Sequence, residues 1–237
     1  MQNYLKHITV IVSFCAISTK GYGTIPIPEP LLYLGHVNVS SPIETAGSHG
    51  AYGFKLGIGA QFTPPNSSQN INNDLFLSTE AGTNDMTYFP KVYWSRGMNI
   101  PLNFGFSYGQ SPDQAEQWSG FAQWVVFEKF KWPAVALRAA ISKLTGLSHS
   151  EITTYNSGAI ISYGFLKYFN LYYSFQGTMH SAKSITHENE AKSYSWNDSN
   201  QTEGIEITIF PPFLKASFEH NHSSLHDSYS SKIAYLF

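Results

Sequence analysis

Long stretches of strict two-residue alternation constrain the fold of this chain most. Between residues 52 and 62, apolar side chains such as Phe54, Leu56 and Ile58 occupy every second position, with mostly Gly, Lys and Gln between them. A β-strand sends alternate side chains to opposite faces, so this pattern predicts a strand with one apolar face. Similar alternation recurs at residues 99–109 and 169–176. We therefore expect an all-β protein.

The length of these segments separates two kinds of β-protein. In a soluble β-sandwich the apolar face forms the core, whereas in a membrane barrel it meets lipid. A tilted membrane strand needs about 9–11 residues, and soluble strands average about 5–6. Residues 52–62, 99–109 and 152–163 have the membrane length. The sequence thus predicts a transmembrane antiparallel up-and-down β-barrel, with a secreted soluble β-sandwich as the alternative.

About ten strands are predicted, at residues 50–63, 86–96, 99–110, 116–128, 134–143, 151–163, 169–179, 204–210, 213–221 and 229–237. The connections between them alternate in length, and the longest are 64–85 and 180–203. Short turns at one end and long loops at the other are typical of transmembrane barrels. Eight or twelve strands remain possible, because 86–96 contains Pro90 and 116–143 is nearly apolar on both faces.

The start of the chain predicts an export signal. Lys6 and His7 precede an apolar run, residues 8–17, that is too short to span a bilayer. Cleavage is expected after Ser18 or after Gly23, so residues 1–23 are assigned to the signal peptide. The one cysteine, Cys15, lies inside this segment, and the mature chain is expected to carry no disulfide.

The end of the chain has Ile233, Tyr235 and Phe237 at alternate positions. This ending resembles the C-terminal strand signature of bacterial outer-membrane β-barrels. The resemblance implies a barrel over residues 50–237 in the outer membrane, and an even strand count places both termini in the periplasm. It also implies two partners, the membrane lipids and the assembly machinery that recognises such an ending. A net charge of −2 gives no basic surface for nucleic acid, and no cofactor is implied.

Residues 24–49 differ from the rest of the chain because they carry prolines at positions 26, 28, 30 and 42. Proline removes a hydrogen-bond donor and makes a regular central strand unfavourable. We expect an extended N-terminal segment that lies in the periplasm or folds back into the barrel as a plug.

Six charged residues fall on the polar faces of the predicted strands: Lys55, Arg138, Glu206, Lys215, Glu219 and Lys232. Buried charges need partners, and a barrel of this size closes around its side chains. We therefore expect an ion-paired, largely filled lumen and no wide channel. The predicted role is structural, surface-interacting or transport of small hydrophobic solutes, without evident catalysis, and the loops 64–85 and 180–203 are expected to meet the outside.

Histidines near the predicted loop ends suggest two further sites. His220 and His222 share one face of a strand and could bind a metal with Glu219 or Asp227, although no tight ligand motif is present. His222 and Ser224 are similar to the His-x-Ser arrangement of outer-membrane phospholipases and lipid A deacylases, in which histidine is the general base for the serine nucleophile. No third residue follows at the spacing of those families. An outer-membrane lipid hydrolase is the alternative function.

Overall fold

The computed structural model describes residues 27, 29–39, 44–47, 49, 53–64, 87–111, 114–129, 132–147, 150–165, 168–185, 191–211, 213–223 and 226–237. These residues form one helix and ten strands: α2 (Glu29–Val39), β1 (Phe54–Thr63), β2 (Thr87–Gly97), β3 (Leu102–Gln110), β4 (Glu116–Phe127), β5 (Ala134–Leu147), β6 (Ser150–Phe165), β7 (Phe169–Ile185), β8 (Ala191–Phe210), β9 (Leu214–Ser223) and β10 (Asp227–Leu236). Among them, no helix is long and apolar enough to cross a bilayer. The predicted signal peptide lies outside the described residues.

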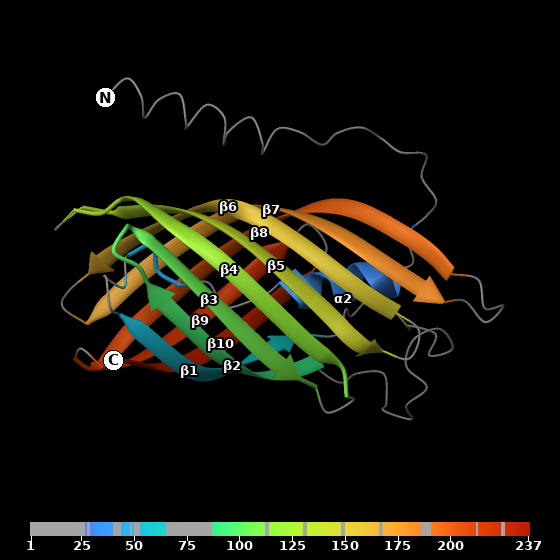
Figure 1. Ribbon diagram of the computed structural model, residues 1–237, viewed down its shortest axis with the longest axis horizontal. Coiled ribbons are helices and arrows are strands. Elements are labelled where there is room, and N and C mark those ends of the chain that lie inside the picture. The colour runs from blue at the N-terminus through green and yellow to red at the C-terminus, as the bar shows by residue number, and fades with distance from the viewer. Residues whose placement is uncertain are drawn as a thin grey trace, which may run out of the picture.

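The ten strands form one closed sheet (Figure 1). Each strand pairs antiparallel with its neighbours in sequence, and β10 returns to pair with β1 from Lys55↔Leu236 to Phe62↔Tyr229. This confirms the predicted up-and-down barrel and its count of ten. The alternative of a soluble β-sandwich is wrong, because a sandwich needs two packed sheets and here a single sheet closes on itself.

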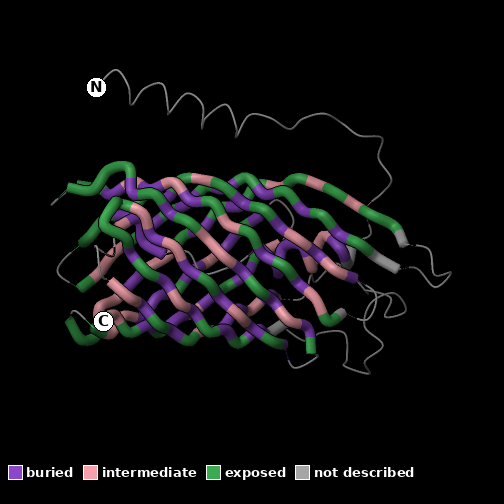
Figure 2. The backbone as a smooth tube through the Cα atoms, in the orientation of Figure 1, coloured by how far each residue is buried: buried purple, intermediate pink, exposed green. Residues whose placement is uncertain are grey.

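The two faces of the wall have opposite character. Along β1, Lys55 is 3% exposed, while its neighbours Leu56 and Ile58 are 44% and 66% exposed. Figure 2 shows the same alternation of buried and exposed positions around the barrel. The outer face carries large apolar side chains, among them Val92, Phe106, Trp124, Ile161 and Phe175. An apolar exterior around a polar interior is the arrangement that a barrel in lipid requires.

The predicted loop 180–203 is wrong, because most of it is strand. β7 continues to Ile185 and β8 begins at Ala191, and the two pair along this whole length. β8 meets β9 only from Asn200↔Ser223 onward, so residues 191–199 project beyond β9 as half of a β-hairpin. Their exposed side chains are mostly Ser and Asn, which water solvates well, so the apolar alternation that marks a membrane strand is missing there. Residues 65–85 of the other predicted loop lie outside the described residues.

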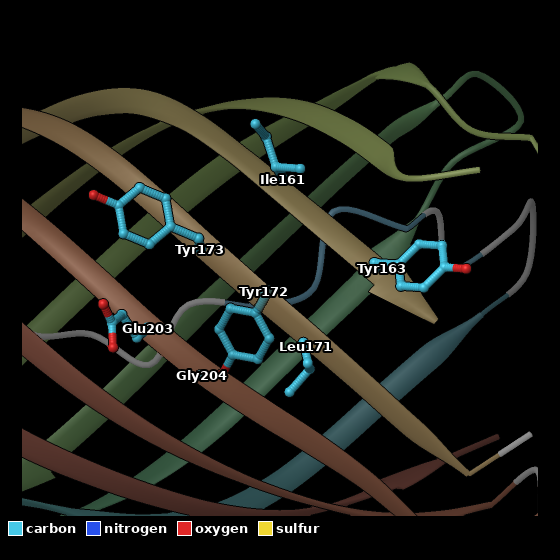
Figure 3. Close-up of a pocket in the computed structure, with 7 residues that line it drawn as sticks. All are labelled: Ile161, Tyr163, Leu171, Tyr172, Tyr173, Glu203 and Gly204. Carbon is cyan, nitrogen blue, oxygen red and sulfur yellow. The ribbon is translucent and has the colours of Figure 1, made fainter. Parts of the chain in front are cut away.

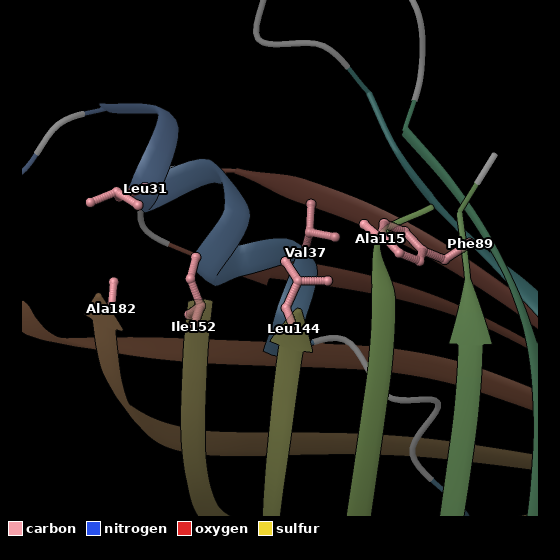
Figure 4. Close-up of a cluster of buried hydrophobic side chains, with 7 residues drawn as sticks. All are labelled: Leu31, Val37, Phe89, Ala115, Leu144, Ile152 and Ala182. Carbon is pink, nitrogen blue, oxygen red and sulfur yellow. The ribbon is translucent and has the colours of Figure 1, made fainter. Parts of the chain in front are cut away.

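Helix α2 lies inside the barrel (Figures 1 and 4). Its Leu31 and Val37 are fully buried and pack in one apolar cluster with Phe89, Ala115, Leu144, Ile152 and Ala182 of the wall. The predicted extended conformation is therefore wrong for residues 29–39. Pro30 is compatible with a helix because it stands in the first turn, where its missing N–H leaves no hydrogen bond unmade.

Residues 29–49 are called the lumen segment, and their described parts, 29–39, 44–47 and 49, reach from one end of the barrel to the other. Tyr33 donates to the carbonyl of Thr63, where β1 ends, and Asn103, near the start of β3, bonds to Gly47 and His49. We call the first of these two ends the long-loop end, because β1 ends there and β2 begins there, on either side of the predicted long loop 64–85. The other is the terminal end, where the amide of Phe237 donates to the carbonyl of Phe54. The first strand of the barrel therefore starts where the last strand finishes, at the terminal end, whereas α2 begins at the long-loop end.

Candidate functional site

The candidate site is the lumen, and its terminal half is built around Glu44 of the lumen segment. Glu44 Oε1 lies 3.6 Å from Lys55 Nζ and 3.4 Å from Lys232 Nζ, and Ser95 Oγ donates to the same oxygen at 3.1 Å. Glu44 Oε2 lies 2.6 Å from His49 Nε2. Burial by itself would raise the pKa of Glu44, but the two ammonium groups and His49 outweigh it and hold that pKa well below its usual range.

The ion pairs continue from Lys55 across the barrel. Lys55 Nζ lies 3.2 Å from Glu206 Oε2, and Lys215 Nζ lies 2.8 Å from Glu206 Oε1. Each of these three charges therefore has an opposite charge in reach, as buried ions require. A third carboxylate, Glu219, accepts hydrogen bonds from Tyr172 at 2.6 Å and from Ser230 at 2.9 Å.

The six charged residues singled out in the sequence all face the interior. Five of them are at least 95% buried, namely Lys55, Arg138, Glu206, Glu219 and Lys232, and the Lys215 side chain is 24% exposed. The sequence analysis missed Glu44 and Lys91. Lys91 follows the alternation of β2 and had a usable signal, whereas Glu44 belongs to a segment without a periodic pattern and had none.

The half of the lumen near the long-loop end is held by apolar packing and by amide hydrogen bonds. Asn38 of α2 donates to the carbonyls of Ser142 and Ile152, and Gln117 donates to the carbonyl of Asn38 at 2.9 Å. His36 is buried, and neither of its ring nitrogens has a hydrogen-bond partner among the described residues. Burial, with a contribution from nearby His226, lowers the pKa of His36 to about 4.

The histidines predicted as a site lie on the outer face of β9. His222 Nδ1 is 2.6 Å from Asp227 Oδ1, and His220 Nε2 is 3.5 Å from the same oxygen. His220 also stacks on Tyr229. Within the described part of the chain, no group of three or more His, Cys, Asp or Glu side chains is placed to bind a metal ion. Ser224 lies outside the described residues.

The three residues of the predicted assembly signal also face outward. Ile233, Tyr235 and Phe237 are all exposed, and the Tyr235 ring packs between Phe213 and Phe237. They line the seam where β10 meets β1. Their recognition by assembly machinery stays a prediction.

A pocket of about 340 Å³ opens on the outer wall across β6, β7 and β8 (Figure 3). Ile161, Tyr163, Leu171 and Tyr173 supply most of its lining. Beneath it, the Tyr172 ring covers Gly204, where a Cβ atom would stand only 2.2 Å from the ring. The pocket lies among side chains that face lipid in a membrane, so we assign it to lipid packing and not to the lumen site.

No protein-family model matches the chain, and a search of curated proteins finds no match. Among solved structures, the chain is similar to the attachment invasion locus protein Ail of Yersinia pestis, with a TM-score of 0.35, 12% identity, and coverage of 79% of this chain and 99% of that one. It is also similar to the KdgM porin in complex with disordered oligogalacturonate (TM-score 0.44, 6% identity, 77% and 99% covered). A third is the N-terminal β-barrel domain of Pseudomonas aeruginosa OprF (TM-score 0.37, 12% identity, 77% and 97% covered).

The class of the chain rests on its own strand pairing and on the character of its two faces. It is a closed, ten-stranded, antiparallel barrel of the bacterial outer-membrane type, with an apolar outer wall and a polar interior. Its subfamily is unassigned.

Proposed function

We propose that this chain is an outer-membrane surface barrel whose lumen is closed by its own lumen segment. The observation that carries the proposal is the set of buried contacts between residues 31–49 and the wall. Hydrogen bonds or ion pairs join this segment to β1, β2, β3, β4, β5, β6 and β10. Contacts on so many sides leave little room for a diffusing solute.

The interior favours a surface or structural role over transport of hydrophobic solutes. Its terminal half is lined by charged and amide side chains, which an apolar solute would have to desolvate. The β7–β8 hairpin, in contrast, extends past β9 and exposes Ser193, Ser195 and Asn197. With the long-loop end placed outside the cell, this hairpin becomes the element offered to other molecules, and Phe237 lies on the periplasmic side.

The test is conductance in a planar lipid bilayer. The wild-type barrel is expected to pass almost no current, while a variant without residues 29–49 is expected to open a steady channel. The shift of the barrel on an SDS gel after boiling checks that both proteins are folded. Equal conductance of the two folded proteins would contradict closure by the lumen segment.

One observation favours a second function, hydrolysis of membrane lipid. The hydrogen bond between His222 Nδ1 and Asp227 Oδ1 orients a histidine on the outer wall, which is the role that the third member of a triad performs. His222 would accept the hydroxyl proton of Ser224 while the serine oxygen attacks the acyl carbon. The ester bond would then break, and the proton would pass to the departing alcohol. Water would later release the acyl group.

The hydrolase is tested with phospholipid and lipid A as substrates. His222→Ala and Asp227→Ala are expected to abolish acyl release. His220→Ala is the matched control, because His220 lies on the same face without the short bond to Asp227. Activity that survives His222→Ala rejects this second function.

A further inference from the structure

The lumen holds more positive than negative side chains. Five cationic residues face inward, namely Lys55, Lys91, Arg138, Lys215 and Lys232, against three carboxylates, Glu44, Glu206 and Glu219. Five against three leaves a formal excess of two positive charges among the lumen side chains that the structure describes. Among the positions of the lumen segment whose side chains the structure does not describe, 29, 30, 40–43 and 48, only Glu29, at the start of α2, is charged. Asp198 and Glu128 lie at the two rims and are partly or fully exposed.

Arg138 is the cation with the most unused hydrogen-bonding capacity. It is 4% exposed, and its guanidinium lies 4.0 Å above the ring of Phe121. Its Nε and Nη1 have no hydrogen-bond partner among the described residues. Leaving such donors empty in a buried site costs free energy, and a guanidinium presents them in a planar fork that suits an anion.

We propose that the lumen binds small inorganic anions at Arg138 and, once the lumen segment has left, conducts anions in preference to cations. The proposal rests on the proposed function, because it requires a lumen that the segment closes. Removal of the segment also removes Glu44, so that five cations then face only two carboxylates. Rings of Arg and Lys are the usual device for anion selectivity in pores.

The first experiment measures the reversal potential of the variant without residues 29–49 in a KCl gradient. We expect the sign that chloride sets, and we expect Arg138→Gln in this background to move the potential toward zero. Arg96→Gln is the matched control, because Arg96 is exposed on the outer face of β2 and should leave the potential unchanged. A potential of the sign that potassium sets, or one insensitive to Arg138→Gln, overturns the inference. Absence of current would instead contradict the proposed closure.

The second experiment uses the full chain, so it does not depend on opening the barrel. A ligand that binds only the folded state raises the unfolding temperature. We therefore expect the temperature of the SDS-gel heat shift to be higher in sodium chloride than in sodium gluconate at equal concentration. Arg96→Gln should keep this difference and Arg138→Gln should lose it. If Arg138→Gln does not fold, Arg138→Lys replaces it and should reduce the difference. A difference unchanged in the Arg138 variant overturns anion binding at this residue.

Discussion

The two halves of the lumen are held by different forces. Near the long-loop end, α2 packs Leu31 and Val37 against apolar residues of the wall. Near the terminal end, Glu44 lies among Lys55, Lys232 and His49. Apolar packing responds to lost volume, whereas a buried ion cluster responds to lost charge and to pH. One short segment is therefore fixed at its two ends in ways that separate experiments can distinguish.

The largest effect is expected from Glu44→Gln. This change keeps the volume but leaves Lys55 and Lys232 without one of their carboxylates, and breaking a buried ion pair typically costs about 3–5 kcal/mol. Urea unfolding of the barrel in detergent measures the free energy of unfolding. A loss below about 1 kcal/mol would show that the terminal half is not held by this cluster.

A similar or smaller loss is expected from Leu31→Ala, which removes a fully buried side chain from the apolar cluster. Such changes cost about 2–5 kcal/mol. Leu32→Ala is the matched control, because it removes the same side-chain atoms at a half-buried position. It should therefore lower the free energy of unfolding by less. Equal losses for the two variants would mean that the packing near the long-loop end is not specific to Leu31.

Acid should weaken the two halves in different pH ranges. The pKa of His36 is lowered to about 4 from 6.5, so the unfolded chain takes up a proton first and stability falls as the pH drops from 6.5 toward 4. The pKa of Glu44 is lowered from 4.5, so its contribution is complete above pH 4.5 and is lost below it. When the free energy of unfolding is measured against pH, the His36→Gln variant should show a smaller slope between pH 6.5 and 4 than the wild type. The same slope in wild type and His36→Gln would rule out this role of His36.

The smallest effect is expected from Glu151→Gln on the outside of the barrel. Glu151 lies 2.7 Å from Lys143, but the side chains are 45% and 49% exposed. Exposed pairs of this kind contribute about 0.2–1 kcal/mol. The loss should therefore be far below that of Glu44→Gln in the same urea assay. Comparable losses would remove the distinction between the buried cluster and the surface pair.

The barrel could be predicted from the sequence because lipid imposes a repeating pattern on every strand that it touches. Pro90 made the second strand uncertain, yet it pairs only with Ala60 of β1, and the pairing of β2 with β3 begins one residue later at Lys91. The missing N–H of Pro90 therefore removes no hydrogen bond from the pairing of β2 with β3.

The parts that could not be predicted are those that lipid does not touch. Residues 191–203 lack a full apolar face, and α2 carries apolar residues on most sides because the barrel surrounds it. Asp227 was named only as a possible metal ligand, and its hydrogen bond to His222 was not predicted, for another reason. Asp227 follows on the next strand, and only the register Asp227↔His222 brings the two side chains together. Sequence spacing alone does not reveal this pair.

The direction of the lumen segment has a mechanical consequence. The segment joins the wall covalently at one point, the start of β1 at the terminal end, and every other connection to the wall is non-covalent. A pull directed outward from the long-loop end would therefore separate side-chain contacts one after another while the ring of strand pairs stayed whole. The interior can therefore empty without the breaking of a strand pair, although the wall loses the stability that the contacts with the lumen segment contribute.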